Sequence, residues 1–233
     1  GTLLYTIEDL AASTNHALQQ YGMPERTLEE VTAFVGNGVA KLIERAVVPG
    51  TDKELFDKVF VEFKKHYAVH NLDHTRPYPG IVDMLTGLKE HGYKVAVVSN
   101  KLQSATQSLC EHFFGELVPL AVGDNPSMAK KPEADMVNEA LCRLNRSRAN
   151  AVYVGDSEVD IETAKNSGMK LIMVEWGFRK RADMEKLGAG CFIDKPEKIF
   201  DILKAAPEYP RRAEADNRIL QLLRDEKYIQ RKG

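Results

Sequence analysis

The sequence predicts an α/β fold of the doubly wound type, a parallel sheet with helices on both faces, and a helical cap subdomain inserted near its start. Two observations predict the sheet. From Lys94 onward, short apolar runs bounded by Gly, Asp or Asn recur, and they alternate strictly with longer amphipathic segments. A third predicts the cap: residues 7–74 contain helix-period apolar positions, such as Leu10, Leu18 and Val31, but no comparable run.

The expected strands are the apolar runs at residues 95–98, 117–122, 152–154, 171–174 and 191–193. The expected helices of the same domain are residues 81–91, 102–114, 133–144, 159–167, 180–187 and 197–203. Residues 76–80 read Arg-Pro-Tyr-Pro-Gly and supply the turn residues of a linker from the cap back to the sheet. We therefore expect a core of residues 1–6 and 80–204, a cap of residues 7–79, and a helical C-terminal tail of residues 205–233.

The composition limits the classes of partner. A chain of 233 residues with 43% hydrophobic content can bury one good core and a smaller second unit. A formal net charge of -2 gives no basic surface for nucleic acid or an anionic membrane. The three cysteines form no Cys-x-x-Cys pair, no run of about 20 apolar residues occurs, and no secretion signal opens the sequence. We expect a cytoplasmic monomer or homodimer.

Polar residues directly after the apolar runs are the first candidates for a site, because ligands of doubly wound sheets collect at the carboxyl ends of the strands. Ser99 and Asn100 follow the first run, and a hydroxyl with successive backbone N–H groups at a helix N-terminus can hold a phosphate. An ordinary helix cap is the alternative explanation. Lys131, directly before Pro132, can neutralise charge on a transferring phosphoryl group; a surface charge pair with Lys130 is the alternative.

The strongest signal is Gly-Asp-Ser-Glu-Val-Asp at residues 155–160, after the run at 152–154. Glycine permits the sharp turn off the strand, and Asp156 and Asp160 lie four residues apart on one side of the opening helical turn. Mg²⁺ prefers oxygen ligands and keeps several waters, so two carboxylates in this place suit it. An acidic helix start favoured by the helix dipole would explain one of these aspartates, but not the whole set of motifs.

These motifs resemble, in order and spacing, those of the haloacid dehalogenase-like hydrolases: Ser99 the second motif, Lys131-Pro132 the third, and residues 155–161 the fourth. The resemblance extends from Gly1 to about Leu203. The first motif of that family, Asp-x-Asp-Gly-Thr, ends the first strand of the sheet. Residues 1–4, Gly-Thr-Leu-Leu, resemble the part of this motif after its two aspartates, so we expect a nucleophilic and an acid/base aspartate upstream of Gly1.

The resemblance also implies roles for the residues that are present. Mg²⁺ would be the cofactor, with Asp156 as its ligand and Asp160 in support. Ser99 and Asn100 would bind the phosphoryl oxygens, and Lys131 would neutralise the nucleophile and the phosphate.

The helical segment resembles the cap that this family inserts after its first motif, which closes over the site and selects the substrate. Gly36, Asn37 and Gly38, followed by Arg45, resemble the caps of phosphoglycolate phosphatases in particular, and we expect them to read an anionic substrate. A simple turn between helices is the alternative.

A second possible metal site lies near the end of the cap, where His66, His70 and His74 are spaced by four. No carboxylate or thiol in this stretch completes a tetrahedral set, so a solvated stripe is the better interpretation.

The function implied is a magnesium-dependent phosphomonoester hydrolase that acts through an aspartyl phosphate on a small phosphorylated metabolite, 2-phosphoglycolate first among them. A pyrophosphatase or a phosphosugar mutase of the same superfamily would share the core motifs, and only the loop at residues 36–38 favours phosphoglycolate over them. A two-carbon haloacid dehalogenase would have no use for the Asp156 and Asp160 pair. If the upstream aspartates are truly absent, the chain is a binding protein that has lost catalysis.

Overall fold

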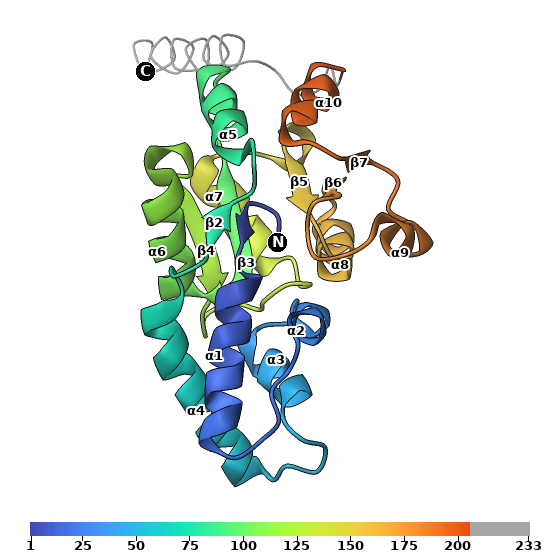
Figure 1. Cartoon of the computed structure of the whole chain (residues 1–233). Helices are drawn as coiled ribbons and strands as arrows, with labels where there is room; N and C mark the ends of the chain where they lie inside the picture. Colours follow the sequence, from blue (N-terminus) through green and yellow to red (C-terminus); the bar gives the residue numbers. More distant parts are fainter. Residues whose placement is uncertain (206–233) are drawn as a thin grey trace, which may run out of the picture.

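The computed structural model describes residues 1–205, so the predicted tail, apart from its first residue, lies outside the described residues. Figure 1 shows two lobes, a helical one built from α1 to α4 and an α/β one built from the later elements, with the N-terminus between them. The helical elements are α1 (Ile7–Gln20), α2 (Leu28–Phe34), α3 (Val39–Ala46), α4 (Lys53–His70), α5 (Ile81–Glu90), α6 (Gln103–Phe114), η1 (Gly115–Leu117), α7 (Asp135–Leu144), η2 (Arg148–Asn150), α8 (Glu158–Ser167), α9 (Arg181–Lys186), η3 (Pro196–Lys198) and α10 (Ile199–Ala205). The strands are β1 (Leu4–Tyr5), β2 (Arg76–Pro77), β3 (Ala96–Leu102), β4 (Leu120–Asp124), β5 (Val152–Gly155), β6 (Lys170–Val174) and β7 (Phe192–Ile193).

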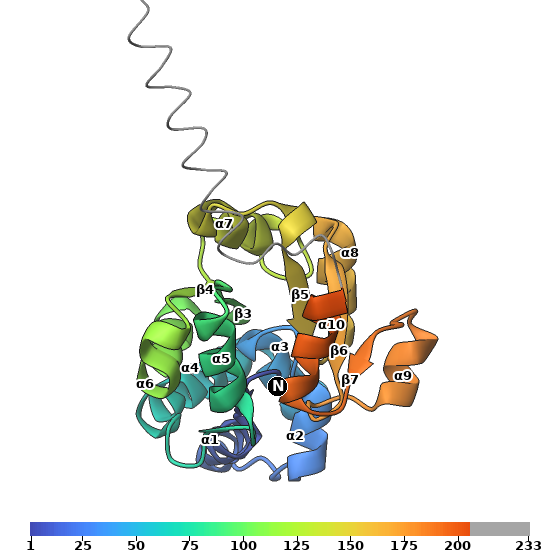
Figure 2. The same cartoon turned by 90° about the horizontal axis from the view of Figure 1, so that it is seen from above.

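The strands of the α/β lobe are parallel, as predicted, but they form two hydrogen-bonded groups instead of one continuous sheet. β3 pairs with β4, and β5 pairs with β6, which pairs with β7. Within the described residues no ladder joins β3 to β5. Figure 2 shows the two groups on either side of the lobe, with α7 at one end and in contact with β3, β4 and α8.

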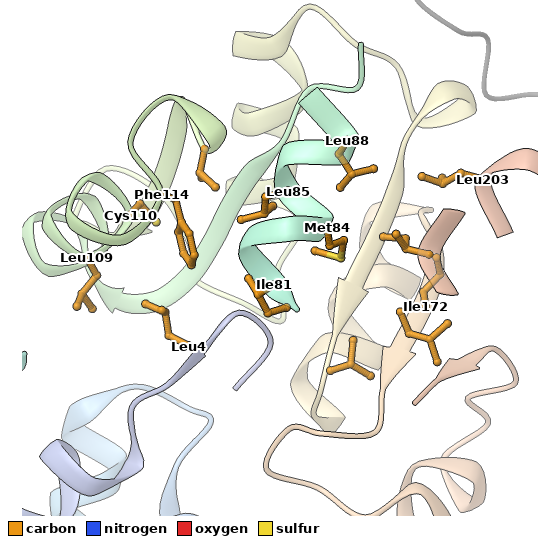
Figure 3. Close-up of a cluster of buried hydrophobic side chains, with 14 residues drawn as sticks. Leu4, Ile81, Met84, Leu85, Leu88, Leu109, Cys110, Phe114, Ile172 and Leu203 are labelled. Atoms are coloured by element: carbon orange, nitrogen blue, oxygen red, sulfur yellow. The ribbon is translucent and has the colours of Figure 1, made fainter. Parts of the chain in front are cut away.

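Helices cover both faces of the strands, which confirms the doubly wound arrangement. On one face, α5 and α6 pack on strands of both groups through Leu85, Phe114 and Ile172 (Figure 3). On the other face, α7 and α8 pack against Val98 and Tyr153. This common core joins the two groups of strands into one folded unit.

The helical lobe has a core of its own, in which α1, α3 and α4 bury Leu18, Ile43 and Phe63. Sequence signals set its helix starts: Thr27 and Glu30 form a reciprocal capping box at α2. The chain crosses between the lobes on β1 and β2, which pair antiparallel. Residues 76–77 were expected in a turn and form β2 instead, because a short edge strand tolerates a proline.

Two boundaries differ from the sequence prediction in ways that affect the site. The second predicted strand begins later, since η1 occupies Gly115–Leu117 and β4 starts at Leu120. β3 continues through Ser99 and Asn100 to Leu102, with a register irregularity between Val98 and Leu102. Ser99 and Asn100, which were predicted at a helix N-terminus, therefore lie on an irregular strand end, and α6 begins at Gln103, directly after the predicted start at residue 102.

Candidate active site

A cavity of about 140 Å³ lies where the carboxyl ends of β3 and β5 face the cap. Its wall contains most of the predicted site residues, namely Ser99, Asn100, Lys131, Asp156 and Asp160 from the core with Gly36 and Gly38 from the cap. Two contacts connect the motifs. The Asn100 amide donates to the carbonyl of Lys131 at 2.9 Å, and Lys131 Nζ contacts Asp160 Oδ1 at 2.9 Å.

Asp160 holds Lys131 and the loop after β5, and it is not free to bind a metal in this structure. Its Oδ1 accepts from Lys131 Nζ and from the Tyr153 hydroxyl, both at 2.9 Å. Its Oδ2 accepts from the backbone N–H groups of Asp156 and Ser157 at 3.0 and 3.1 Å, and from the Ser157 hydroxyl. Both oxygens of Asp160 are thus occupied, which fits the supporting role predicted for it beside Asp156 and leaves it no free oxygen for direct metal binding.

Charge and burial oppose each other at this ion pair. Burial alone would raise the pKa of Asp160, but the neighbouring Lys131 charge and the hydrogen bonds lower the pKa below its ordinary value. Burial alone would lower the pKa of Lys131, yet Asp160 raises that pKa above its ordinary value. Lys131 is therefore a fixed positive charge in the cavity wall.

Asp156 differs from Asp160 because no lysine or arginine of the described residues pairs with it. Its carboxylate is 6% exposed, and it accepts from the Thr2 hydroxyl at 2.8 Å and the backbone N–H of Phe178 at 3.1 Å. Gly177 permits this close approach, since a Cβ there would lie 2.2 Å from the Asp156 Cβ. Asn100 Oδ1, in the same cavity wall, is also buried, and it has no hydrogen-bond partner among the described residues.

These oxygens fit a hard cation. Mg²⁺ takes one or two carboxylates and keeps several waters, so Asp156 is a sufficient ligand from this part of the chain. The described residues contain no group of three or more His, Cys, Asp or Glu side chains arranged to hold a metal.

The cap contributes its glycine loop to the cavity, but not the side chains predicted to read the substrate. Gly36 and Gly38 have φ values of 139° and 87°, which side chains rarely adopt. Arg45 and Asn37 are absent from the cavity wall. Arg45 donates instead to the carbonyl of Phe34 at 2.7 Å and to Asn37 Oδ1 at 3.2 Å, so it closes the end of α2.

The histidines of the cap form a stack of rings that does not include all three of the residues spaced by four. His66 and His70 stack at 4.2 Å between ring centroids, and His16 of α1 stacks on His66 at 4.1 Å. His74 lies apart and contacts Asp9 at 3.0 Å.

Two contacts between core and cap were not foreseen from the sequence. Arg179, in the loop after β6, pairs with Glu158 and donates to the carbonyls of Thr32 and Val35 at 3.0 and 2.6 Å. Arg179 follows the apolar run at residues 171–174. The rule that site residues come after the strands of a doubly wound sheet therefore also indicates Arg179. Lys101 contacts Tyr67 of α4, and no sequence signal predicts this pair because it depends on how the cap docks.

The fold and this site define a hydrolase of the haloacid dehalogenase-like class. The family model for haloacid dehalogenase-like hydrolases matches residues 1–174, and the chain belongs to this family. It is similar to proteins named phosphoglycolate phosphatase from Aquifex aeolicus, at 34% identity over 77% of this chain and 83% of that protein, and from Caulobacter vibrioides, at 29% identity over 89% and 90%. A candidate phosphoglycolate phosphatase structure from Lactobacillus delbrueckii subsp. bulgaricus matches with a TM-score of 0.81 at 34% identity, over 85% and 92%. The chain is therefore a phosphatase.

No helix among residues 1–205 has the length and apolar character needed to cross a membrane.

Proposed function

We propose that this protein hydrolyses the phosphomonoester of a small metabolite, 2-phosphoglycolate first among them, in a reaction that requires Mg²⁺. The observation that carries the proposal is the convergence of Ser99, Lys131 and Asp156 on one cavity beneath the cap. The names of the similar proteins support the choice of substrate.

Different residues of the cavity bind the phosphoryl oxygens, neutralise their charge and hold the metal ion. Ser99 and the backbone N–H groups of the irregular end of β3 bind phosphoryl oxygens, and Lys131 neutralises the charge that develops as the phosphoryl group is transferred. Asp160 orients Lys131 through the 2.9 Å contact. Asp156 would hold Mg²⁺, which supplies charge neutralisation at the phosphoryl oxygens when it is bound.

The mechanism also needs a nucleophile and an acid/base group. The two carboxylates of the cavity wall, Asp156 and Asp160, are both engaged in hydrogen bonds with their neighbours. We propose that aspartates preceding Gly1 supply the nucleophile and the acid/base. The Gly1 nitrogen lies 3.8 Å from Asp156 Oδ1, so residues bonded to it would begin at the cavity. The first aspartate would attack phosphorus while the second protonates the leaving oxygen and later takes a proton from the attacking water.

The test compares the chain that starts at Gly1 with one extended by the natural upstream residues, in phosphate release from 2-phosphoglycolate across a magnesium titration. We expect turnover only in the extended protein, with a phosphorylated aspartate that can be trapped. Turnover by the chain that starts at Gly1 would show that another residue is the nucleophile. Tight phosphate binding without turnover by the extended protein would favour a binding protein. The proposed setting is a cytoplasmic monomer or homodimer.

A further inference from the structure

The cavity contains one cationic side chain that has no counter-charge among the described residues. Three cationic side chains line the wall, namely Lys101, Lys131 and Arg179. Lys131 is paired with Asp160 at 2.9 Å, and Arg179 with Glu158 at 2.8 Å. Lys101 has no carboxylate within ion-pair distance in residues 1–205. An unpaired ammonium beside a cavity attracts an anion, because partial burial strengthens the attraction over that in water.

Lys101 is fixed in place by the cap. Its ammonium donates to the Tyr67 hydroxyl and lies 4.4 Å from the centre of the Tyr67 ring. Tyr67 belongs to α4 and is only 6% exposed, so the core lysine meets a rigid partner of the cap. An ammonium has three N–H groups, and no described residue accepts the hydroxyl proton of Tyr67. Lys101 lies in the cavity wall and keeps N–H groups free to donate to a ligand, whereas Tyr67 lies outside the wall and positions the lysine.

The position of Lys101 separates it from the phosphoryl-binding residues. Ser99, Lys131 and Asp156 belong to the core part of the cavity wall, whereas the Lys101 side chain extends from the core to Tyr67 of the cap. The other cap residues of the wall include Leu10, Val39 and Leu42, whose apolar side chains offer an anion no hydrogen bond. A substrate held by its phosphoryl group would thus present its second end toward Lys101.

We propose that Lys101, positioned by Tyr67, binds a carboxylate of the substrate. The protein thereby selects phosphomonoesters of small hydroxy acids over neutral phosphomonoesters. This inference rests on the proposed function. It assigns to the pair Lys101 and Tyr67 the role that the sequence suggested for Arg45, whose guanidinium closes the end of α2.

Two non-hydrolysable ligands test the inference by binding alone. 3-Phosphonopropionate matches the length of 2-phosphoglycolate and keeps its carboxylate, and propylphosphonate replaces that carboxylate with a methyl group. Calorimetry on the full-length protein with Mg²⁺ should show that the wild type binds the carboxylate ligand at least about tenfold more tightly, the amount of one charge-assisted hydrogen bond. Lys101→Met should remove this preference and leave the affinity for propylphosphonate unchanged within about twofold. Tyr67→Phe, which keeps the ring, should reduce it partly.

The matched control is Lys64→Met, because Lys64 also lies over an aromatic ring, Phe60, at 4.5 Å, but on the exposed face of α4. It should keep the wild-type preference. Equal affinity of the wild type for the two ligands, or an undiminished preference in Lys101→Met, would overturn the inference and leave the proposed function standing. Failure of both ligands to bind the wild type would overturn the proposed function, and this inference with it.

Discussion

Asp156 and Asp160 show how neighbours decide what a side chain does. Both are almost fully buried, and they lie one helical turn apart. Asp160 is surrounded by donors, including Lys131, so its charge is compensated within the protein. Asp156 receives one hydroxyl and one backbone N–H. A buried carboxylate with so few partners favours a cation. The spacing of the two aspartates does not separate their roles, and only the family resemblance did so in the sequence.

Substitution of Asp156 by Asn tests the metal assignment. The amide keeps the size and one oxygen but loses the charge, so we expect at least about a hundredfold lower turnover in the extended protein, relieved in part by high Mg²⁺. Phosphate release across a magnesium titration measures the effect, with circular dichroism to confirm folding. Asp83→Asn on the exposed face of α5 is the control. Wild-type kinetics in Asp156→Asn would defeat the assignment.

Gly155 is required by space, since a Cβ there would lie 2.2 Å from the Asp160 Cβ. Gly155→Ala must displace Asp160 and with it Lys131, so we expect a loss of about 1–3 kcal/mol in the free energy of unfolding. Urea denaturation gives the value. Gly190→Ala is the matched control, because no atom lies within 4 Å of its added Cβ and its φ is not positive. Equal stability of the two variants would contradict the close packing of Gly155 on Asp160.

At the scale of the element, hydrophobic periodicity predicted the strands and helices of the α/β lobe, because each buries one face on the same core. It did not predict that β3 would continue through Ser99 and Asn100. That extension depends on pairing with β4, where Leu102 opposes Asp124 after an irregular register. A ladder formed by residues distant in sequence leaves no local signal in the polar segment that it includes.

Substitution of Arg179 tests whether this residue connects the loop after β6 to the end of α2. Lysine cannot form its contacts with both the Glu158 carboxylate and the two cap carbonyls, so Arg179→Lys should loosen α2. We expect amide hydrogen exchange in residues 28–38 to become about tenfold faster, as the loss of one or two hydrogen bonds predicts. Arg181→Lys, whose pairs with Glu175 and Glu185 are exposed, is the control. Unchanged exchange in Arg179→Lys would rule out this connection.

The histidine stack links α1 and α4 and responds to pH. Burial, followed by the charges of His16 and His70, lowers the pKa of His66. Folding therefore favours the neutral ring, and the unfolded chain binds a proton more readily. The stability contributed by neutral His66 is present above its unfolded pKa of about 6.5 and is lost as the pH falls below that value.

Acids near the stack oppose this effect in part. Glu62 contacts His16 at 3.4 Å, Asp73 contacts His70 at 2.8 Å, and the uncharged Ser13 hydroxyl contacts His66. We expect the free energy of unfolding to fall between pH 7 and pH 5 by less in His66→Gln than in the wild type. Urea denaturation at both pH values measures it, with exposed His112→Gln as the control. An identical fall in wild type and His66→Gln would contradict the stack as its origin.

For the whole molecule, the sequence predicted which residues of the core meet at the cavity but not how the cap completes it. Ser99 lies near the carboxyl end of β3, and Lys131 and Asp156 follow β4 and β5, so the parallel topology brings the three residues together. Tyr67 and Arg45 lie on helices whose orientation depends on packing between the lobes. One of them reaches a cavity residue and the other does not, and no local pattern distinguishes them.

The crossing between the lobes depends on a buried carboxylate. Asp9, in the first turn of α1, is 1% exposed. It accepts from the backbone N–H groups of His74 and Thr75 at 2.9 and 2.8 Å, and from the Thr75 hydroxyl at 2.7 Å. The start of α1, where the chain enters the cap, is thus hydrogen-bonded to residues 74–75, where the chain leaves the cap.

Removal of this carboxylate should weaken the joint between the lobes. Asp9→Ala leaves buried donors of residues 74–75 without an acceptor, each at a cost of about 1–3 kcal/mol, so we expect roughly 3 kcal/mol lower stability. Asp9→Asn keeps one oxygen and should lose about half as much. Urea denaturation measures stability, and small-angle scattering should show wider lobe separation in Asp9→Ala. Asp57→Asn, in an exposed pair with Lys53, is the control. If Asp9→Ala matched that control in both measurements, the joint would lie elsewhere.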